Sequence, residues 1–464
     1  MTTTPLASKT APTALSSHWR DLWTKEDWWA IWLGLGIVGI AYLLFANGLS
    51  LKWIAVTPDK WSSLSQLGAH FAANAPRYLA QFVAWVVLFS VALAALGHRV
   101  RDFAPSFVFV YVVSVAIFAL GQWTQATTYN LEPPLVALLL GLLISNLVGL
   151  PRWMDAGFRV EFYVKTGIVL LGATLPFSLI LWAGPVAILQ ASIVSLVTFF
   201  VIYFVARKLG LERPLAATLG AGGSVCGVSA AIAIAGAVGA KKQDAPIAIT
   251  VVIFWAIAMI FLLPLVAHGL QLPTGVAGAW IGTSEFADAA GFAAAQAYGG
   301  YAGQGGVAGS ADQAVWAFTL MKVVGRDVWI GVWALALAIV STTRWEPTTT
   351  GRTPDAGEIW RRFPKFVIGF LVASLIVTYA ARGYALADFN KAVNPTLVGP
   401  IKDLRTWAFI FCFLSIGLTT RIKDLASAGR KPLAAFTAGV VVNVLLGFVL
   451  SVAVFASYWT HLAR

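Results

Sequence analysis

Between Gly220 and Ser229, four glycines and two serines interrupt a long apolar stretch of the chain. Each glycine destabilises a helix interior by about 1 kcal/mol relative to alanine, so this composition favours a broken helix. A break inside a membrane leaves backbone N–H groups that protein, water or ligand must satisfy, and successive N–H groups at a helix start bind anions. The alternative is close helix packing through small residues. The predicted substrate-binding residues of this segment are Gly222, Gly223, Ser224, Cys226, Gly227 and Ser229.

Two carboxylates, Glu285 and Asp288, lie three residues apart in another apolar stretch. On a helix this spacing puts both on one face. A carboxylate at membrane depth is costly, so each must face a polar cavity, pair with a base or take a proton. We predict that both bind a coupling cation. The alternative for Glu285 is that it caps a helix start at the outer membrane interface.

Lys322 and Arg326 stand four residues apart in a later apolar span, and Asp327 follows directly. Their spacing again places both basic groups on one helical face. They could balance Glu285 and Asp288 or neutralise an anionic substrate, and we predict them as substrate-binding residues. A structural ion pair, or snorkelling of long side chains to an interface, is the alternative.

The composition shows which elements must position these residues. Apolar residues make up 59% of the 464 residues and charged residues 11%, against about 25% in globular proteins, which predicts a polytopic membrane protein. The net charge of +12 sits mostly in short loops, where topology and anionic lipid explain it better than nucleic acid does. Two cysteines and five scattered histidines provide neither a disulfide framework nor metal-ligand spacing, so we predict no cofactor and no metal.

Apolar runs of suitable length predict about eleven full spans in an all-α fold. They lie near residues 28–48, 77–97, 104–124, 132–150, 159–180, 185–206, 245–268, 313–342, 366–382, 406–420 and 431–458. Residues 1–27 are predicted as a mostly disordered cytoplasmic tail, residues 28–130 as an N-terminal transmembrane extension, and residues 131–464 as the transporter core.

Loop charge predicts how two further apolar stretches, 215–240 and 280–300, run through the membrane. Several loops, including those at 207–213, 241–242 and 343–365, carry Lys and Arg, whereas the loops at 125–131, 181–184 and 269–279 carry none. If basic loops are cytoplasmic, both stretches must enter and leave on the same side. The first then enters from the cytoplasm and the second from outside. The N-terminus is predicted inside and the C-terminus outside.

An internal repeat supports this arrangement. Residues 172–184 align without gaps on residues 417–429, with Gly, Thr, Ala and Gly matched at four positions. The predicted topology runs the two copies in opposite directions. Such inverted repeats with discontinuous helices are typical of secondary transporters, whose sites lie between the repeats. Chance similarity is the alternative, because these residues are common in membrane helices.

The chain resembles the YeiH-type family of inner-membrane proteins, whose family label is sulfate export. The resemblance rests on the Gly220–Gly227 cluster with Cys226, on Gly282-Thr-Ser284, and on Gly417-Leu-Thr-Thr420, together with shorter matches between residues 131 and 455. It implies an inverted-repeat fold similar to cation/proton antiporters and bile-acid transporters. The chain departs from the family where Phe286 replaces a usual His, and where Lys322 and Arg326 are four rather than three residues apart.

We therefore predict a multi-pass secondary transporter of the bacterial inner membrane that exports a small anion, such as sulfate or a sulfonate, coupled to protons or Na⁺. The predicted partners are the anion, the coupling cation and the lipid bilayer, with a homo-oligomer as a further option. A cation/proton antiporter on the same fold, or a non-transporting membrane scaffold, is the alternative. An enzyme is not predicted, because Ser224 and Cys226 have no His nearby in sequence.

Overall fold

The computed structural model describes residues 15–126, 133–345, 360, 363–384, 388–421, 423 and 429–462. Across these ranges the chain is helical, and the β-structure consists of one isolated bridge between Trp61 and Trp123. Within the described residues, seven helices are long and apolar enough to cross a membrane. The predicted all-α, polytopic membrane fold is thereby confirmed.

The seven long helices coincide with predicted spans. They are α2 (Glu26–Ala46), α3 (Leu64–Ala95), α4 (Val100–Gly121), α7 (Phe177–Lys208), α10 (Asp244–Gly269), the continuous helix Ala311–Trp345 and the continuous helix Arg430–Val454. The helix Ala311–Trp345 contains α13 (Ala311–Thr319), a π-helical segment (Leu320–Arg326) and α14 (Trp329–Val340), while Arg430–Val454 begins with α20 (Arg430–Phe448). The other four predicted spans correspond to α5 (Pro133–Leu143), α6 (Val160–Gly172), α16 (Phe366–Ala381) and α18 (Gly399–Thr419), which are shorter or carry more charge.

Several predicted boundaries are wrong: α3 begins at Leu64 and not near residue 77, and α11 begins at Thr274, inside the predicted loop 269–279. The sequence places a loop at 181–184 between two spans, but α6 already ends at Gly172 and α7 begins at Phe177 and continues through Pro185. Pro176 lies at the N-cap of α7, where a proline cannot continue the preceding helix. The uncharged residues 181–184 are therefore part of a long helix. The predicted tail is also partly ordered, since α1 spans Leu15–Thr24, while residues 1–14 lie outside the described part.

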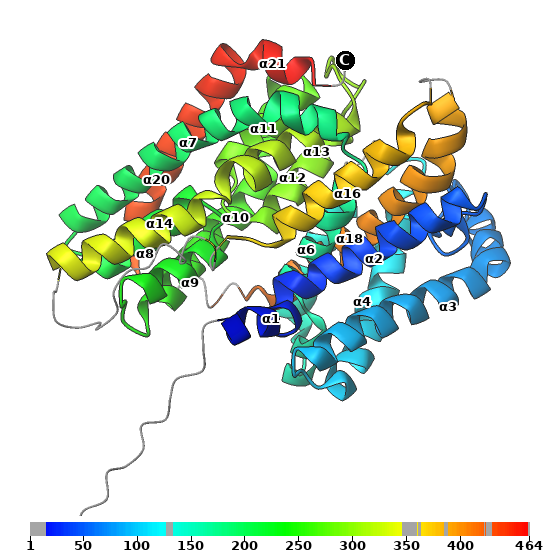
Figure 1. Cartoon of the computed structure of the whole chain (residues 1–464), viewed down its shortest axis with the longest axis horizontal. Coiled ribbons are helices and arrows are strands. Elements are labelled where there is room, and N and C mark those ends of the chain that lie inside the picture. The colour runs from blue at the N-terminus through cyan, green and yellow to red at the C-terminus, as the bar shows by residue number, and fades with distance from the viewer. Residues whose placement is uncertain are drawn as a thin grey trace, which may run out of the picture.

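The helices form two bundles that lie side by side (Figure 1). The first bundle consists of α2, α3, α4, α5, α6, α16 and α18, in which α18 packs on α4, α5 and α6, and α16 packs on α2 and α6. The second bundle consists of α7 to α14 with α20 and the short C-terminal α21 (Ala456–Thr460). The chain passes from the first bundle to the second between α6 and α7 and again between α18 and α20. Both crossings lie in the two aligned repeat segments, although residues 422 and 424–428 of the second copy lie outside the described part.

The helix α2 is bound to α6 of the predicted core by ion pairs from Glu26 and Asp27, which the sequence places at the end of the tail. Lys165 on α6 places its Nζ 3.0 Å from Oε1 of Glu26 and 2.9 Å from Oδ1 of Asp27, both at the start of α2. Glu161, one turn away from Lys165, is a more distant partner at 3.8 Å. These contacts tie the first span of the chain to a helix of the predicted core.

The stretch predicted to enter and leave on one side, residues 215–240, is a helical hairpin, called the first hairpin here. Its arms are α8 (Arg213–Ser224) and α9 (Val228–Ala237). The arms lie side by side, and Glu212 at the beginning pairs with Lys241 after the end. The start of α8 and the end of α9 therefore lie close together, at what is called the open end of the first hairpin.

The second hairpin consists of α11 (Thr274–Ser284) and α12 (Asp288–Gly299). Its arms run in opposite directions along α13. On α11, Gly278 packs against the backbone of Ala314 and Gly282 against Phe318, whereas on α12 Gly299 packs near Ala311, at the start of α13. The hydroxyl of Tyr298, near the end of α12, donates a hydrogen bond to the carbonyl of Leu272, just before α11 (2.6 Å). The start of α11 and the end of α12 therefore also lie close together, at the open end of the second hairpin.

The helix α10 connects the open ends of the two hairpins. Its 26 residues span about 39 Å, roughly the thickness of a bilayer, so a membrane-spanning α10 separates these ends by the width of the membrane. The hairpins thus extend from opposite ends of a candidate membrane span, which is the arrangement that the loop charges predict. Since 343–365 and 125–131 lie largely outside the described residues, this conclusion rests on the hairpins and α10.

This arrangement predicts the outcome of cysteine labelling. In a protein whose Cys226 and Cys412 are replaced by alanine, a cysteine at exposed Lys242 is expected to react with a membrane-impermeant maleimide only from one face of the membrane. A cysteine at exposed Gln304 is expected to react only from the other face. The positive charge at 241–242 assigns Lys242 to the cytoplasm. Labelling of both positions from the same face would contradict the paired hairpins.

Candidate functional site

The tips of the two hairpins meet inside the second bundle. The first tip is the turn Val225–Gly227 and the second is the turn Glu285–Ala287. Gly227 has φ +74°, and a Cβ at this position would lie only 2.5 Å from the carbonyl oxygen of Phe286. A residue with a side chain would be strained there and would push the tips apart. The contact between the tips thus depends on glycine.

Lys322 lies beneath this contact and binds both tips. Its Nζ donates hydrogen bonds to the carbonyl oxygens of Val225 (2.7 Å), Glu285 (3.2 Å) and Phe286 (3.4 Å). The side chain is fully buried. An ammonium group with three carbonyl acceptors is well satisfied, so the first role that the structure gives Lys322 is to hold the two turns together.

Arg326 makes a second bridge between the hairpins. On the first hairpin its guanidinium donates to the carbonyls of Ser224 (3.2 Å) and Gly223 (3.1 Å). On the second it donates to the carbonyls of Thr283 (2.6 Å) and Glu285 (3.0 Å). These carbonyls end α8 and α11, where a helix has unpaired acceptors and partial negative charge. The positive charges of Lys322 and Arg326 therefore offset the partial negative charge at the C-terminal ends of α8 and α11.

The spacing of Lys322 and Arg326 follows from the local helix geometry. Both belong to the π-helical segment Leu320–Arg326, whose hydrogen bonds join residues five apart. In this wider turn, residues four apart lie nearly above one another. The four-residue spacing therefore still points both cations at the hairpin tips. π-helical turns occur frequently at functional sites.

The helices α12 and α9, which form the second arms of the hairpins, differ in the groups that lie at their N-terminal ends. The start of α12 is acidic: Oε1 of Glu285 accepts the N–H groups of Phe286 (3.0 Å) and Ala287 (3.3 Å), and Asp288 is the first residue of the helix. Negative groups at a helix start interact favourably with its dipole. Glu285 thus binds the N–H groups of the turn just before α12, whose own start has no side-chain cap, and it is buried at the tip and not at the outer interface. Oδ1 of Asp288 lies 3.5 Å from Nζ of Lys322.

The start of α9 carries no such acidic group. Its N-cap is Gly227, and no side chain caps the helix. Val228 and Ser229 are half-buried, while Ser224 and the thiol of Cys226 are buried. The N–H groups at this helix start are therefore without a side-chain cap, in the position where the sequence predicts an anion.

Two of the predicted substrate-binding glycines face neighbouring helices. A Cβ at Gly223 would meet the side chains of Ile202 and Phe436, and a Cβ at Gly222 would meet Val252. Both positions thus allow close packing, the alternative considered from the sequence. The contribution of Gly223 to the tip is its carbonyl, which binds Arg326. Contact of either glycine with a substrate stays a prediction.

The charged groups at the tips form one cluster, called the tip cluster: Glu285, Asp288, Lys322 and Arg326. The sequence predicts all four as site residues, and the structure brings them together from three elements. What the sequence does not indicate is that the main partners of the two cations are backbone carbonyls. No residue type signals such contacts, since every residue carries a carbonyl.

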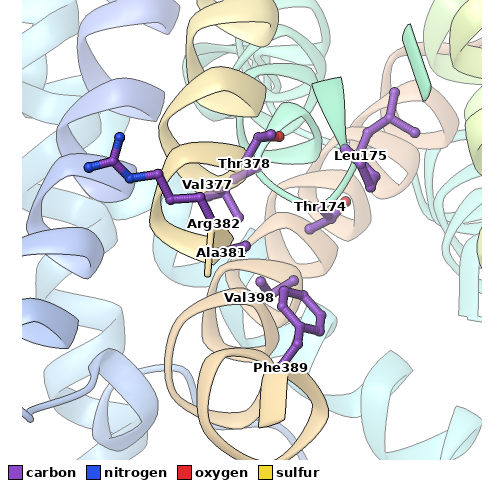
Figure 2. A pocket seen from close by; sticks show the side chains of 10 residues that line it. Thr174, Leu175, Val377, Thr378, Ala381, Arg382, Phe389 and Val398 are labelled. Carbon is purple, nitrogen blue, oxygen red and sulfur yellow. The ribbon is translucent and has the colours of Figure 1, made fainter. Parts of the chain in front are cut away.

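A cavity of about 310 Å³ lies elsewhere, at the crossing between α6 and α7 (Figure 2). Its walls include Thr174, Leu175, Thr378 and Phe389. Oγ1 of Thr174 accepts a hydrogen bond from Nη1 of Arg405 (3.0 Å). None of the predicted site residues is among those lining this cavity, which is thus distinct from the tip cluster.

Comparison with known proteins places the chain among membrane proteins. The sequence profile of the family described as "Conserved hypothetical protein 698" matches residues 105–436. A UPF0324 membrane protein of Rhodopirellula baltica is 32% identical over 413 residues, which cover 87% of this chain and 72% of that protein. A UPF0324 membrane protein of Nitrosomonas europaea is 28% identical over 471 residues, with 90% and 93% coverage.

A UPF0324 membrane protein of Nitratidesulfovibrio vulgaris is 33% identical over 366 residues, or 78% of this chain and 61% of that protein. The match therefore covers less than two thirds of this relative's length. No solved structure matches the chain.

Proposed function

Because the chain belongs to the family of Conserved hypothetical protein 698, whose relatives are named UPF0324 membrane proteins, we propose that it is a secondary transporter of a small anion. This membership also confirms the YeiH-type resemblance seen in the motifs. The anion would be sulfate or a sulfonate, exported across the bacterial inner membrane with coupling to protons or Na⁺. Neither an enzymatic activity nor a cofactor is part of the proposal.

The observation that carries the proposal is the meeting of two oppositely inserted hairpins over a buried pair of cations. Non-helical backbone at membrane depth is tolerated only where protein buries it or where it lines a polar cavity. Discontinuous helices that place their ends at the membrane centre are typical of secondary transporters. A membrane scaffold would have no need for two such breaks or for four charged side chains between them.

The start of α9 is the part of the tips that best suits an anion. Its N–H groups have no side-chain cap, the hydroxyl of Ser229 is half-buried, and the positive end of the helix dipole points at the tip. Lys322 and Arg326 would add positive charge beneath the site while their hydrogen bonds hold the carbonyls. Glu285 and Asp288 would provide the negative charge that a coupling cation balances.

Flux into proteoliposomes tests this function. We expect labelled sulfate or a short sulfonate to accumulate in vesicles that contain the purified protein when a proton or Na⁺ gradient is imposed. Protein-free vesicles serve as the control. Exchange of Na⁺ for protons without anion flux would favour the cation/proton antiporter instead. The absence of any gradient-driven flux would contradict transport.

A further inference from the structure

Asp327 is a buried carboxylate beside the tip cluster to which the preceding sections give no role. It follows Arg326 on the helix Ala311–Trp345 and is 1% exposed. Among the described residues, neither of its two carboxyl oxygens has a hydrogen-bond partner. Buried carboxylates are normally paired or hydrogen-bonded, because an unpaired charge away from water costs several kcal/mol. Asp327 therefore requires a specific explanation.

Adding Asp327 to the tip cluster leaves an imbalance of charge. The side chain of Asp327 interacts electrostatically with Asp288, Lys322 and Arg326. With Glu285 the group contains two cationic and three anionic side chains, all of them buried except for the 14% exposed side chain of Asp288. If every group were ionised, the group would carry one surplus negative charge. Glu161 and the thiol of Cys226 are the further titratable groups that interact with Asp327.

The contacts of Glu285 and Asp288 indicate that the surplus negative charge belongs to Asp327. Glu285 accepts two backbone N–H groups, and Asp288 has both Lys322 and the positive start of α12. These contacts favour the carboxylate forms of Glu285 and Asp288, each of which has one oxygen without a hydrogen-bond partner in the described residues, whereas Asp327 has two. Asp327 has no comparable partner, so neutralising it removes the most costly charge at the tips.

A proton neutralises Asp327 more readily than a metal cation does. Hard cations in proteins are held by several oxygen ligands. In the described part of the chain, no three His, Cys, Asp or Glu side chains are grouped so that they could hold a metal ion, and the carbonyls of Gly223, Ser224, Val225 and Thr283 at the tips already accept hydrogen bonds from Lys322 and Arg326. A proton needs one oxygen, and Asp327 offers two that are unoccupied by other donors.

We propose that Asp327 is the proton-binding site of this protein and that its carboxylate takes up the coupling proton to become a neutral carboxylic acid. This inference rests on the proposed transport function, narrows its coupling ion from proton or Na⁺ to the proton, and moves the coupling site from Glu285 and Asp288 to Asp327. An anion bound at the start of α9 adds negative charge near the tips and favours the protonated form of Asp327. Anion and proton therefore bind together, and by linkage each increases the affinity for the other. Two ligands that bind together cross in the same direction, so this inference replaces proton-driven export with proton–anion symport.

Infrared spectroscopy tests the proton site without any substrate. The difference spectrum of purified protein between acidic and alkaline buffer is expected to contain a carboxylic-acid C=O band that is lost in Asp327→Asn. The band should persist in Asp388→Asn, which changes an exposed aspartate. Asp327→Asn keeps the size of the side chain, and its elution from a sizing column should match wild type. A band unchanged by Asp327→Asn would overturn the assignment.

An uptake assay distinguishes a failure of this inference from a failure of the proposed function. We expect Asp327→Asn to lower proton-driven sulfate or sulfonate accumulation by about tenfold or more while equilibrium exchange of the same anion persists. If wild-type protein shows no anion flux, the proposed function fails. If wild type transports and Asp327→Asn still accumulates the anion with the pH gradient, transport stands and the role of Asp327 is wrong.

Discussion

Arg326→Ala is expected to lose most of its folded, transport-competent protein. The substitution removes the hydrogen bonds from the guanidinium to carbonyls of both hairpin tips, including those of Ser224 and Thr283. Each buried carbonyl left without a donor costs about 1–3 kcal/mol, so the total loss should exceed about 3 kcal/mol. Thermal unfolding of the detergent-purified protein, followed by tryptophan fluorescence, measures this loss as a lower melting temperature.

Two further variants show whether the geometry of Arg326 or only its charge matters. Arg326→Lys keeps the charge but not the planar fork, so it should lie between wild type and Arg326→Ala. Arg101→Ala removes an exposed arginine on α4 and should leave the melting temperature close to that of wild type. A melting temperature of Arg326→Ala equal to that of wild type would show that the guanidinium does not hold the hairpins together.

Gly227→Ala is expected to reduce transport strongly and to destabilise the protein. The added Cβ would lie 2.5 Å from the carbonyl oxygen of Phe286 and 2.9 Å from Cγ1 of Val252, so the tips must separate. The left-handed backbone at φ +74° adds about 1–2 kcal/mol for a residue with a Cβ. Melting temperature and gradient-driven anion uptake should both fall.

Gly184→Ala is the matched control within the second bundle. A Cβ at Gly184, on α7, would meet no atom within 4 Å, and its backbone is helical. Alanine there should be neutral or stabilise the helix by up to about 1 kcal/mol. If Gly227→Ala behaved like Gly184→Ala in both measurements, close contact between the tips would be unnecessary for folding and transport.

Much of the membrane architecture could be read from the sequence because its signals are local. Runs of apolar residues locate the long helices, and glycine-rich or charged interruptions locate the two breaks. The lysines at 241–242 and the uncharged residues 269–279 indicate that each interrupted stretch returns to its own side, and the paired arms of both hairpins agree. The boundary at 181–184 was misplaced because missing charge does not distinguish a loop from a helix that passes Pro185.

The residues of the tip cluster were identified for a similar reason. Charged side chains such as Glu285 and Lys322 are conspicuous in apolar stretches, since burying them is costly. Their partners could not be predicted in this way. Lys322 binds the carbonyl of Val225, 97 positions earlier, and Arg326 that of Gly223, 103 positions earlier. Such contacts depend on how two hairpins and a third helix pack, which no local pattern encodes.

The sequence by itself thus determined the class of protein, the helix breaks and the identity of the buried charges, because hydropathy and glycine content act within a few residues. Only the tertiary structure decided that the breaks face each other, that the cations bind the carbonyl ends of α8 and α11, and that Asp327 has no partner for its carboxylate in the described residues. These features arise from contacts between distant segments. Their energies depend on burial and on geometry, which exist only once the chain has packed.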